Sequence, residues 1–312
     1  MRILYTRGET FANEYLADGV FHGLKQLGHE VIDVPELWYM YNDGRGGPGE
    51  FNSHTELHGR GFTLYRLFDN DADIDRTDIE NKIRTQYFDL CILARADFGS
   101  PYEELLLEHY SPDKIIILDG RDQVDIRHHR DSRHLITRGT YFKRELFGAT
   151  DRIHPISFSF PKEKIIHPSR IDKVNLISGA KPVFKDANGV AHYSYDNELD
   201  YYQEYARSYF GETQAKGGWD CMRHYEIMAA GGVPIFHGIE QCPDLTCTTL
   251  PKEELLAVNG LITEHGIEWF LTSTGQAVYE ELQSRIFEHF VTDCITEAAA
   301  KYILDIHAKV TQ

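Results

Sequence analysis

The sequence has no long hydrophobic run, and no stretch of its 312 residues approaches the roughly 20 consecutive apolar residues of a membrane-spanning helix. The opening residues, MRILYT, form too short an apolar stretch for a secretory signal peptide, and polar residues follow at once. We therefore expect an unanchored protein that works in the cytoplasm.

Cysteine is scarce and loosely spaced. The chain has five cysteines, an odd number, and no C-x-x-C pair occurs among them. That spacing argues against a zinc ribbon and against a thioredoxin-type redox motif. Because free thiols are the rule in reducing compartments, we expect all five to be reduced. They are Cys91, Cys221, Cys242, Cys247 and Cys294.

Positive charge is also in short supply. The chain has 32 Lys and Arg against 49 Asp and Glu, a formal net charge of −17. Such a surface repels the nucleic-acid backbone and anionic lipids, which counts against nucleic acid as a partner without excluding a local basic groove. No G-x-S-x-G, Walker loop or H-E-x-x-H occurs, so the sequence lacks the signatures of serine esterases, P-loop enzymes and zincin proteases.

What the chain does contain is an alternation of strand-like and helix-like segments, which predicts an α/β protein with mainly parallel sheets. The runs FDLCILA at 88–94 and KIIIL at 114–118 have the composition of strands buried on both faces. Hydrophobic periodicity and end signals predict further strands at 3–6, 29–34, 173–179, 208–212 and 233–236, and helices at 11–27, 77–85, 102–109, 199–207, 223–230 and 275–308.

The length suggests two domains, at roughly 100–200 residues each. The proline-bounded segment PISFSFP, residues 155–161, marks the expected linker. We predict an N-terminal Rossmann-like lobe over residues 1–160 and a C-terminal Rossmann-like lobe with terminal helices over 161–312. Residues 42–61 contain six glycines and one proline, which indicates a mobile surface loop of the length that often forms a functional lid.

The most informative segment is SYFGETQAKGGWDCMRHYEIMAAGGVP, residues 208–234. It reads as strand, glycine-rich loop, helix, double glycine and strand, and the loop-to-helix junction offers backbone N–H groups to phosphates. Lys216 and Arg223 add positive charge, and Glu226 lies on the same helix face as Arg223 and can accept from ribose hydroxyls. The pattern predicts a nucleoside diphosphate site. The alternative is a surface ion pair between Arg223 and Glu226, which contributes ~0–1 kcal/mol.

Residues 223–235, RHYEIMAAGGVPI, resemble the donor-site segment of GT-B glycosyltransferases, and are most similar to the exostosin-like and spore-coat-type families with their R-x-x-E-x-x-A-x-G-x-x-P pattern. The resemblance implies two Rossmann-like lobes, a C-terminal helix that crosses back to the N-terminal lobe, and a sugar-nucleotide donor such as a UDP-sugar. It assigns Glu226 to the ribose and Arg223 to the phosphates. The further donor-binding candidates are Lys216, Gly217, Gly218, Trp219, Lys143 and Arg144, the last two being open to reading as a solvated helix end.

Sugar transfer with inversion needs a general base for the acceptor hydroxyl and positive charge on the leaving diphosphate. Many retaining relatives carry a second glutamate eight positions before the ribose glutamate, where this chain has Gly218, which favours inversion. In the GT-B fold the base comes from the N-terminal lobe, and loops after parallel strands line the cleft. The candidates are Glu9 first, then Asp97, Asp119 and Asp122, each of which can also be a turn residue or helix cap.

Two clusters resemble metal sites but do not fit one. The acidic run at 69–75 has Ile74 where an EF-hand loop needs glycine. His128, His129 and His134 are interleaved with arginines, whose charge disfavours a metal ion. We therefore expect no metal and no cofactor beyond the sugar nucleotide.

Together these features predict a metal-independent glycosyltransferase that moves a hexosyl or pentosyl group from a nucleoside diphosphate to a glycan or another hydroxyl acceptor. The alternatives are a sugar-nucleotide epimerase, a non-catalytic sugar-nucleotide-binding protein, and a glucosyltransferase-like enzyme that modifies a hydroxymethylated base in viral DNA. The arginine-rich stretch 121–134 keeps the last alternative open despite the acidic surface.

Overall fold

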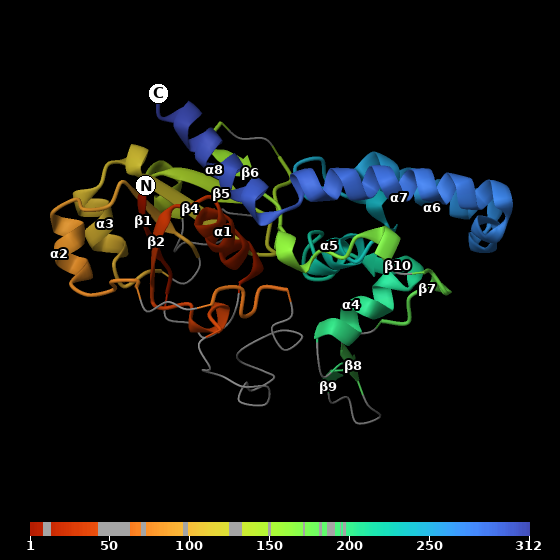
Figure 1. Cartoon of the computed structure of the whole chain (residues 1–312). Helices are drawn as coiled ribbons and strands as arrows, with labels where there is room; N and C mark the ends of the chain where they lie inside the picture. Colours follow the sequence, from red (N-terminus) through yellow and green to blue (C-terminus); the bar gives the residue numbers. More distant parts are fainter. Residues whose placement is uncertain are drawn as a thin grey trace. The chain divides into compact units, whose positions relative to one another are not determined.

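The computed structural model describes the chain except for residues 9–13, 43–62, 70–72, 96–98, 125–132, 149–150, 171, 181–182, 186–190, 194 and 196–197 (Figure 1). The chain divides into two compact units. Unit 1 comprises residues 1–159, 243–248 and 296–312, and unit 2 comprises residues 160–242 and 249–295.

Unit 1 is built on a parallel sheet with the strand order β2-β1-β3-β4-β5-β6. All residues of β3 and β4 are buried, as expected of the two apolar runs in the sequence. The strand order reverses direction between β1 and β3. The strands are β1 (Arg2–Thr6), β2 (Glu30–Val34), β3 (Leu90–Leu93), β4 (Ile115–Asp119), β5 (Thr140–Lys143) and β6 (Ile153–Pro155).

The helices of unit 1 pack on this sheet and on one another. Helix α8, drawn in blue at the C-terminal end of the chain, packs against α1 (Figure 1). The approach is close because residue 23 is a glycine, and a Cβ there would overlap the Thr296 carbonyl. The α-helices are α1 (Tyr15–Gln26), α2 (Ile79–Arg84), α3 (Glu103–His109) and α8 (Thr296–Val310), and the 3₁₀ turns are η1 (Trp38–Met40), η3 (Pro112–Lys114) and η5 (Arg133–Thr137).

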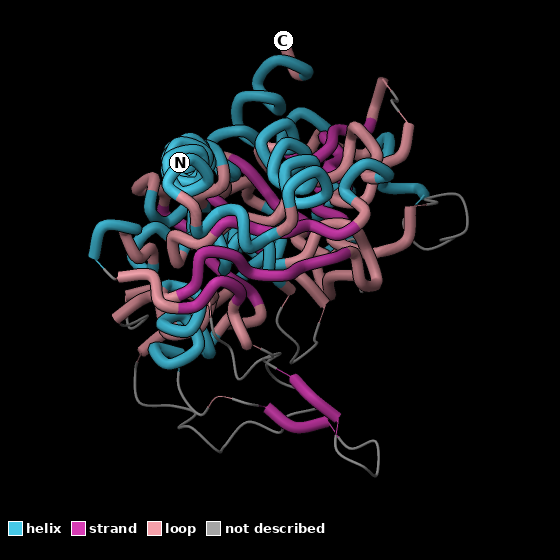
Figure 2. The backbone as a smooth tube through the Cα atoms, turned by 90° about the vertical axis from the view of Figure 1, so that its right-hand side faces the viewer, coloured by secondary structure: helices cyan, strands magenta, loops and turns pink. Residues whose placement is uncertain are grey.

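Unit 2 contains a smaller parallel sheet in the order β11-β10-β7, and β8 and β9 form an antiparallel pair apart from the other strands (Figure 2). Its strands are β7 (Asn175–Ile177), β8 (Val183–Lys185), β9 (Ala191–Tyr193), β10 (Ser208–Gln214) and β11 (Val233–His237). Its α-helices are α4 (Glu198–Ala206), α5 (Met222–Ala229), α6 (Lys252–His265) and α7 (Ser273–Asp293), and its 3₁₀ turns are η6 (Lys162–Lys164), η7 (Pro168–Arg170), η8 (Ile239–Gln241) and η9 (Ile267–Leu271).

The structure confirms the predicted fold class: an α/β protein with mainly parallel sheets in two Rossmann-like parts. Within the described ranges, no helix combines the length and apolar character needed to cross a bilayer.

The structure adds local detail at three helices. The helix predicted at 77–85 begins later, at Ile79: its N-cap is Asp78, which has φ 52° and makes no side-chain cap, and the Thr77 hydroxyl donates to Asp75 instead. The helical tail predicted at 275–308 is present, and it consists of two helices, α7 and α8, which are separated around Cys294. Helix α6 was not predicted from the sequence. Only Leu255 and Val258 are buried in it, so its hydrophobic periodicity is weak.

Candidate functional site

The donor motif lies at the carboxyl end of β10, where the chain turns through residues 215–221 into α5. Gly211 in β10 lets α5 pack directly on the strand, because a Cβ there would lie 2.7 Å from Cγ1 of Ile227. Gly231, with φ +70° and the atoms of Pro168 close by, ends the helix and returns the chain to β11. Loops after parallel strands are where α/β folds place ligands, so this edge is the expected binding edge of unit 2.

Glu226 is held in place by a buried tyrosine. Its side chain is 8% exposed, and the Tyr201 hydroxyl donates to its Oε2 at 2.6 Å. Tyr201 comes from α4, and burial together with the neighbouring Glu226 carboxylate raises the pKa of Tyr201 well above its usual value. The tyrosine therefore remains a proton donor, and it orients the carboxylate.

Arg223 lies one helical turn before Glu226 and is half-buried. Among the described residues it makes no ion pair with Glu226 or any other carboxylate, so the surface ion pair considered as an alternative is not formed. Its Nε is buried without a hydrogen-bond partner in the described part of the chain. A buried guanidinium donor left unsatisfied is costly, and a bound anion would remove that cost.

Lys216 brings a second cation to the same edge. Its backbone N–H donates to the Gly218 carbonyl at 2.9 Å, which closes the turn that contains Gly217. Desolvation and the charge of Arg223 lower the pKa of Lys216, and Glu226 raises it. The three charged side chains of the motif are thus electrostatically coupled around one loop.

His224 is a site residue that sequence reasoning missed. It is fully buried and stacks on Phe236, with ring centroids 4.1 Å apart. Its Nε2 lies 2.8 Å from the Trp219 carbonyl and its Nδ1 2.9 Å from Oγ1 of Thr213. Burial lowers the pKa of His224 to about 4, so the ring is neutral at pH 7. Because a carbonyl only accepts, Nε2–H is the donor and Nδ1 accepts from Thr213. The ring ties the donor loop to β10.

A second tie holds the end of the same loop. The Tyr225 hydroxyl donates to Oδ1 of the buried Asp220 at 2.9 Å. With His224, this contact fixes Trp219 and Asp220 immediately before α5. In the sequence, these two contacts could be suspected only because His224 and Tyr225 stand between Arg223 and Glu226. The structure places both on the buried side of the helix.

Lys143 lies in unit 1, at the end of β5, with its side chain 1% exposed. Its Nζ donates to the Arg121 carbonyl at 2.7 Å and lies 3.4 Å from Oδ1 of Asp119. Desolvation lowers the pKa of Lys143 and the Asp119 charge opposes that effect. Lys143 is therefore a buried, compensated cation, and its proposed role toward phosphate stays a prediction.

Asp119, a candidate for the general base, accepts hydrogen bonds from several side chains. Arg121 donates to it from Nε at 2.9 Å and from Nη2 at 2.7 Å, and the Tyr141 hydroxyl donates at 2.7 Å. Burial raises the pKa of Asp119, but Arg121 and Lys143 outweigh it and hold the pKa below its usual value. A carboxylate stabilised in this way is a poor proton acceptor.

Arg144 is buried beside Lys143. It donates from Nε to the Gly120 carbonyl at 2.9 Å and from Nη1 to Glu145 at 2.8 Å, and it forms an ion pair with Asp122. The side chain of Asp122, another candidate for the base, is 52% exposed and is paired with this arginine. Neither Lys143 nor Arg144 is on a solvated helix end, since Lys143 is the last residue of β5 and Arg144 follows it directly.

Several predicted features fall outside the described residues: the base candidates Glu9 and Asp97, His128 and His129, and nearly all of the predicted 42–61 loop. The described residues contain no group of His, Cys, Asp or Glu arranged to hold a metal ion.

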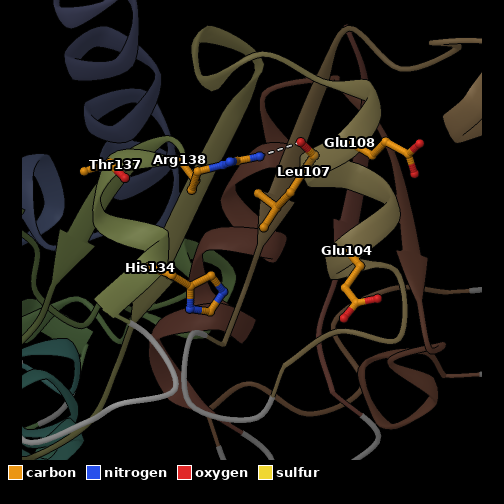
Figure 3. A pocket seen from close by; sticks show the side chains of 6 residues that line it. All are labelled: Glu104, Leu107, Glu108, His134, Thr137 and Arg138. Carbon is orange, nitrogen blue, oxygen red and sulfur yellow. Dashed lines mark hydrogen bonds between the residues drawn. The ribbon is translucent and has the colours of Figure 1, made fainter.

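A shallow hollow in unit 1 lies between α3 and η5 (Figure 3). Arg138 crosses it to donate to the Leu107 carbonyl at 2.6 Å, and His134 contacts Glu103 at 2.8 Å. The hollow contains no residue of the donor motif and is lined by Glu104, Leu107, Glu108, His134, Thr137 and Arg138.

No protein-family model and no curated protein sequence matches this chain. Solved structures do. An alpha-glucosyltransferase in complex with UDP and a 13-mer DNA is 12% identical, with a TM-score of 0.50 over 99% of this chain and 100% of the other. AviGT4, a glycosyltransferase involved in avilamycin A biosynthesis, is 11% identical, with a TM-score of 0.47 over 100% and 98%. MurG of Acinetobacter baumannii is 10% identical, with a TM-score of 0.36 over 99% and 100%. The likeness does not confirm the exostosin-like or spore-coat resemblance; it shows that the chain has the fold of GT-B glycosyltransferases.

Proposed function

We propose that this protein is a glycosyltransferase that moves a sugar from a nucleoside diphosphate donor, a UDP-sugar, to a glycan or another hydroxyl acceptor. One observation carries the proposal. At the carboxyl edge of β10, the buried Nε of Arg223 has no partner among the described residues, one helical turn from the tyrosine-held carboxylate of Glu226. A cation with an unused donor beside an oriented carboxylate matches the two ends of a ribose diphosphate.

Each motif residue has a role in that proposal. Arg223 donates to diphosphate oxygens, and Lys216 adds a second positive charge on the exposed side of the loop. Glu226 accepts from the ribose hydroxyls with the geometry that Tyr201 imposes. Gly217 and Gly218 let the loop backbone approach the phosphates, and Trp219 is anchored by His224.

The proposed reaction is an inverting displacement without a metal ion. The acceptor hydroxyl oxygen forms a bond to the anomeric carbon while the bond from that carbon to the diphosphate oxygen breaks, and the hydroxyl proton passes to a base. Arg223 and Lys216 stabilise the charge that develops on the leaving diphosphate, which is the task a metal ion performs in other transferases. Gly218 stands where retaining relatives carry a glutamate.

The fold likeness agrees with this reading, since the alpha-glucosyltransferase with the shared fold was solved with UDP bound. The same structure contains DNA, which keeps a base in DNA as a second candidate acceptor. The net charge of −17 favours a glycan or small hydroxyl acceptor. We place the reaction in the cytoplasm, where thiols stay reduced.

Binding of UDP-, GDP- and dTDP-sugars, measured by calorimetry and thermal shift, tests the proposal. We expect a UDP-sugar to stabilise the wild type and Glu226→Ala to weaken that binding without unfolding the protein. Glu281→Ala, at an exposed position of α7, is the matched control. Nucleoside diphosphate released only with acceptor present indicates transfer, and its persistence in EDTA indicates metal independence. No binding of any sugar nucleotide contradicts the proposal.

A further inference from the structure

Unit 2 contains a buried hydroxyl that the proposed donor contacts do not use. Tyr205 lies near the end of α4 and is 2% exposed. Its hydroxyl has no hydrogen-bond partner among the described residues. An unpaired hydroxyl inside a folded protein is unfavourable, so a ligand group that pairs with it gains in affinity.

The position of Tyr205 on α4 brings it to the donor motif. Tyr205 lies one turn after Tyr201, and residues four apart share one face of a helix. The two rings meet edge to face, with centroids 5.2 Å apart. Tyr201 in turn donates to Oε2 of Glu226 at 2.6 Å. The unpaired hydroxyl of Tyr205 therefore belongs to the same cluster as the carboxylate proposed to hold the ribose.

The charges around Tyr205 agree with this placement. Burial raises the pKa of Tyr205, the Glu226 carboxylate raises it further, and Arg223 and Tyr201 lower it. The phenol is therefore protonated at neutral pH, and it can both donate and accept a hydrogen bond. Both charged residues of the motif act on it, the acid assigned to the ribose and the arginine assigned to the phosphates.

Two different ligand groups would satisfy the two unpaired atoms of this cluster. The Nε of Arg223 is also buried without a partner in the described part of the chain, and because arginine only donates, a phosphate oxygen suits it. A phenol beside a carboxylate suits an alcohol, which can donate to the carboxylate and accept from the phenol. The two neighbouring hydroxyls of a ribose are such alcohols, and a nucleoside diphosphate carries them together with the phosphates.

We propose that the Tyr205 hydroxyl donates to one of the two ribose hydroxyls of the donor while Glu226 accepts from both, so that the site selects ribonucleoside diphosphates over their deoxy forms. This assignment rests on the proposed transferase function and narrows its substrate class. All three residues of the cluster, with Arg223, lie in unit 2. A nucleotide without the hydroxyl leaves buried polar groups unpaired, and sites of this kind reject such analogues strongly. Donors built on dTDP are therefore disfavoured, although they carry the same diphosphate.

Calorimetric titration with UDP, 2′-deoxy-UDP and 3′-deoxy-UDP tests the assignment whichever sugar the donor carries. The wild type should bind both deoxy forms, and dTDP, about 10- to 100-fold more weakly than UDP, the size of a lost hydrogen bond to a charged group. Tyr205→Phe should bind UDP about 3- to 10-fold more weakly, as expected for a lost neutral hydrogen bond. It should bind one deoxy form, the one that lacks the partner hydroxyl, as well as the wild type does.

The ligand-free protein supplies a second readout. Because the removed hydroxyl has no partner in the described chain, Tyr205→Phe should keep or raise the ligand-free Tm. Tyr279→Phe is the matched control, since Tyr279 is also buried in unit 2 and its hydroxyl donates to the Tyr209 carbonyl at 2.8 Å. The control should lose Tm and leave all three nucleotide affinities unchanged.

The outcomes are distinct. Equal weakening of UDP and both deoxy forms in Tyr205→Phe, or an unchanged affinity for UDP, overturns the assignment, as does wild-type binding of both deoxy forms within threefold of UDP. The transferase function stands in each of these cases. Should Tyr205→Phe fail to fold, Tyr205→Met, which also removes the hydroxyl, is judged by the same affinities. If the wild type prefers guanine, GDP and its deoxy forms replace the uridine series. If it binds no nucleoside diphosphate and no sugar nucleotide, the proposed function fails first and this assignment with it.

Discussion

Tyr201 donates its hydroxyl proton to Oε2 of Glu226 at 2.6 Å, although the two residues lie on different helices of unit 2. Both side chains are buried. A charge-assisted hydrogen bond of this kind fixes the direction in which the carboxylate presents its lone pairs. The donor motif is therefore more than a local pattern on α5, since its acid is oriented by α4.

Tyr201→Phe tests that relationship. Removing the hydroxyl takes away a donor that orients Glu226, so we expect UDP-sugar affinity to fall about 10- to 100-fold, the size of a lost hydrogen bond to a charged group. Tyr279→Phe is the matched control, because Tyr279 donates to the Tyr209 carbonyl at 2.8 Å and does not touch Glu226. Both variants should lose similar stability in urea titrations. Equal affinity in both would show that Tyr201 is only structural.

Arg223→Ala should separate binding from stability. The buried Nε of Arg223 has no partner in the described chain, so truncation removes an unsatisfied donor and we expect the ligand-free Tm to stay level or rise. Donor affinity should fall about 10- to 100-fold as a phosphate contact is lost. Arg285→Ala, which breaks an exposed ion pair with Glu254, should change neither. A large drop in the ligand-free Tm of Arg223→Ala would argue for a structural arginine.

The burial of His224 predicts that the free energy of unfolding depends on pH. Burial lowers its pKa to about 4 in the folded protein, whereas the unfolded chain takes up the proton near pH 6.5. The unfolded state therefore binds more protons between these values, and stability is lost as pH falls from about 6.5 to 4, by roughly 3 kcal/mol in all. Comparison with His224→Asn by urea denaturation at several pH values isolates this residue. Parallel curves for the two proteins would show that His224 does not titrate in this range.

Gly23 and Gly260 make a matched pair of helical glycines. Gly23→Ala should destabilise unit 1, because its Cβ would overlap the Thr296 carbonyl and push α8 off α1, a cost of about 1–3 kcal/mol for overpacking. Gly260→Ala in α6 meets open space and should raise stability by up to about 1 kcal/mol. Limited proteolysis of the C-terminal helix, together with denaturant titration, distinguishes the two. Equal behaviour would mean that α8 does not pack closely on α1.

What the sequence determined by itself was local. The apolar runs at 88–94 and 114–118 became buried strands, and the order strand, loop, helix, strand over 208–234 appeared as predicted, because short-range periodicity and glycine stops act within a few residues. The spacing of Arg223 and Glu226 on one helix was likewise readable from the chain.

The tertiary structure decided which charged side chains are paired within the protein and which keep a polar atom for a ligand. Asp119 and Lys143 form an ion pair inside unit 1. In unit 2, Glu226 accepts a hydrogen bond from Tyr201, and the Nε of Arg223 has no hydrogen-bond partner among the described residues. Glu14, at the N-cap of α1, lies against Gly120 after β4, because parallel strands have their carboxyl ends on one edge of the sheet. These pairings join residues far apart in the chain, and their energies depend on burial and on strand order, which local sequence patterns do not encode.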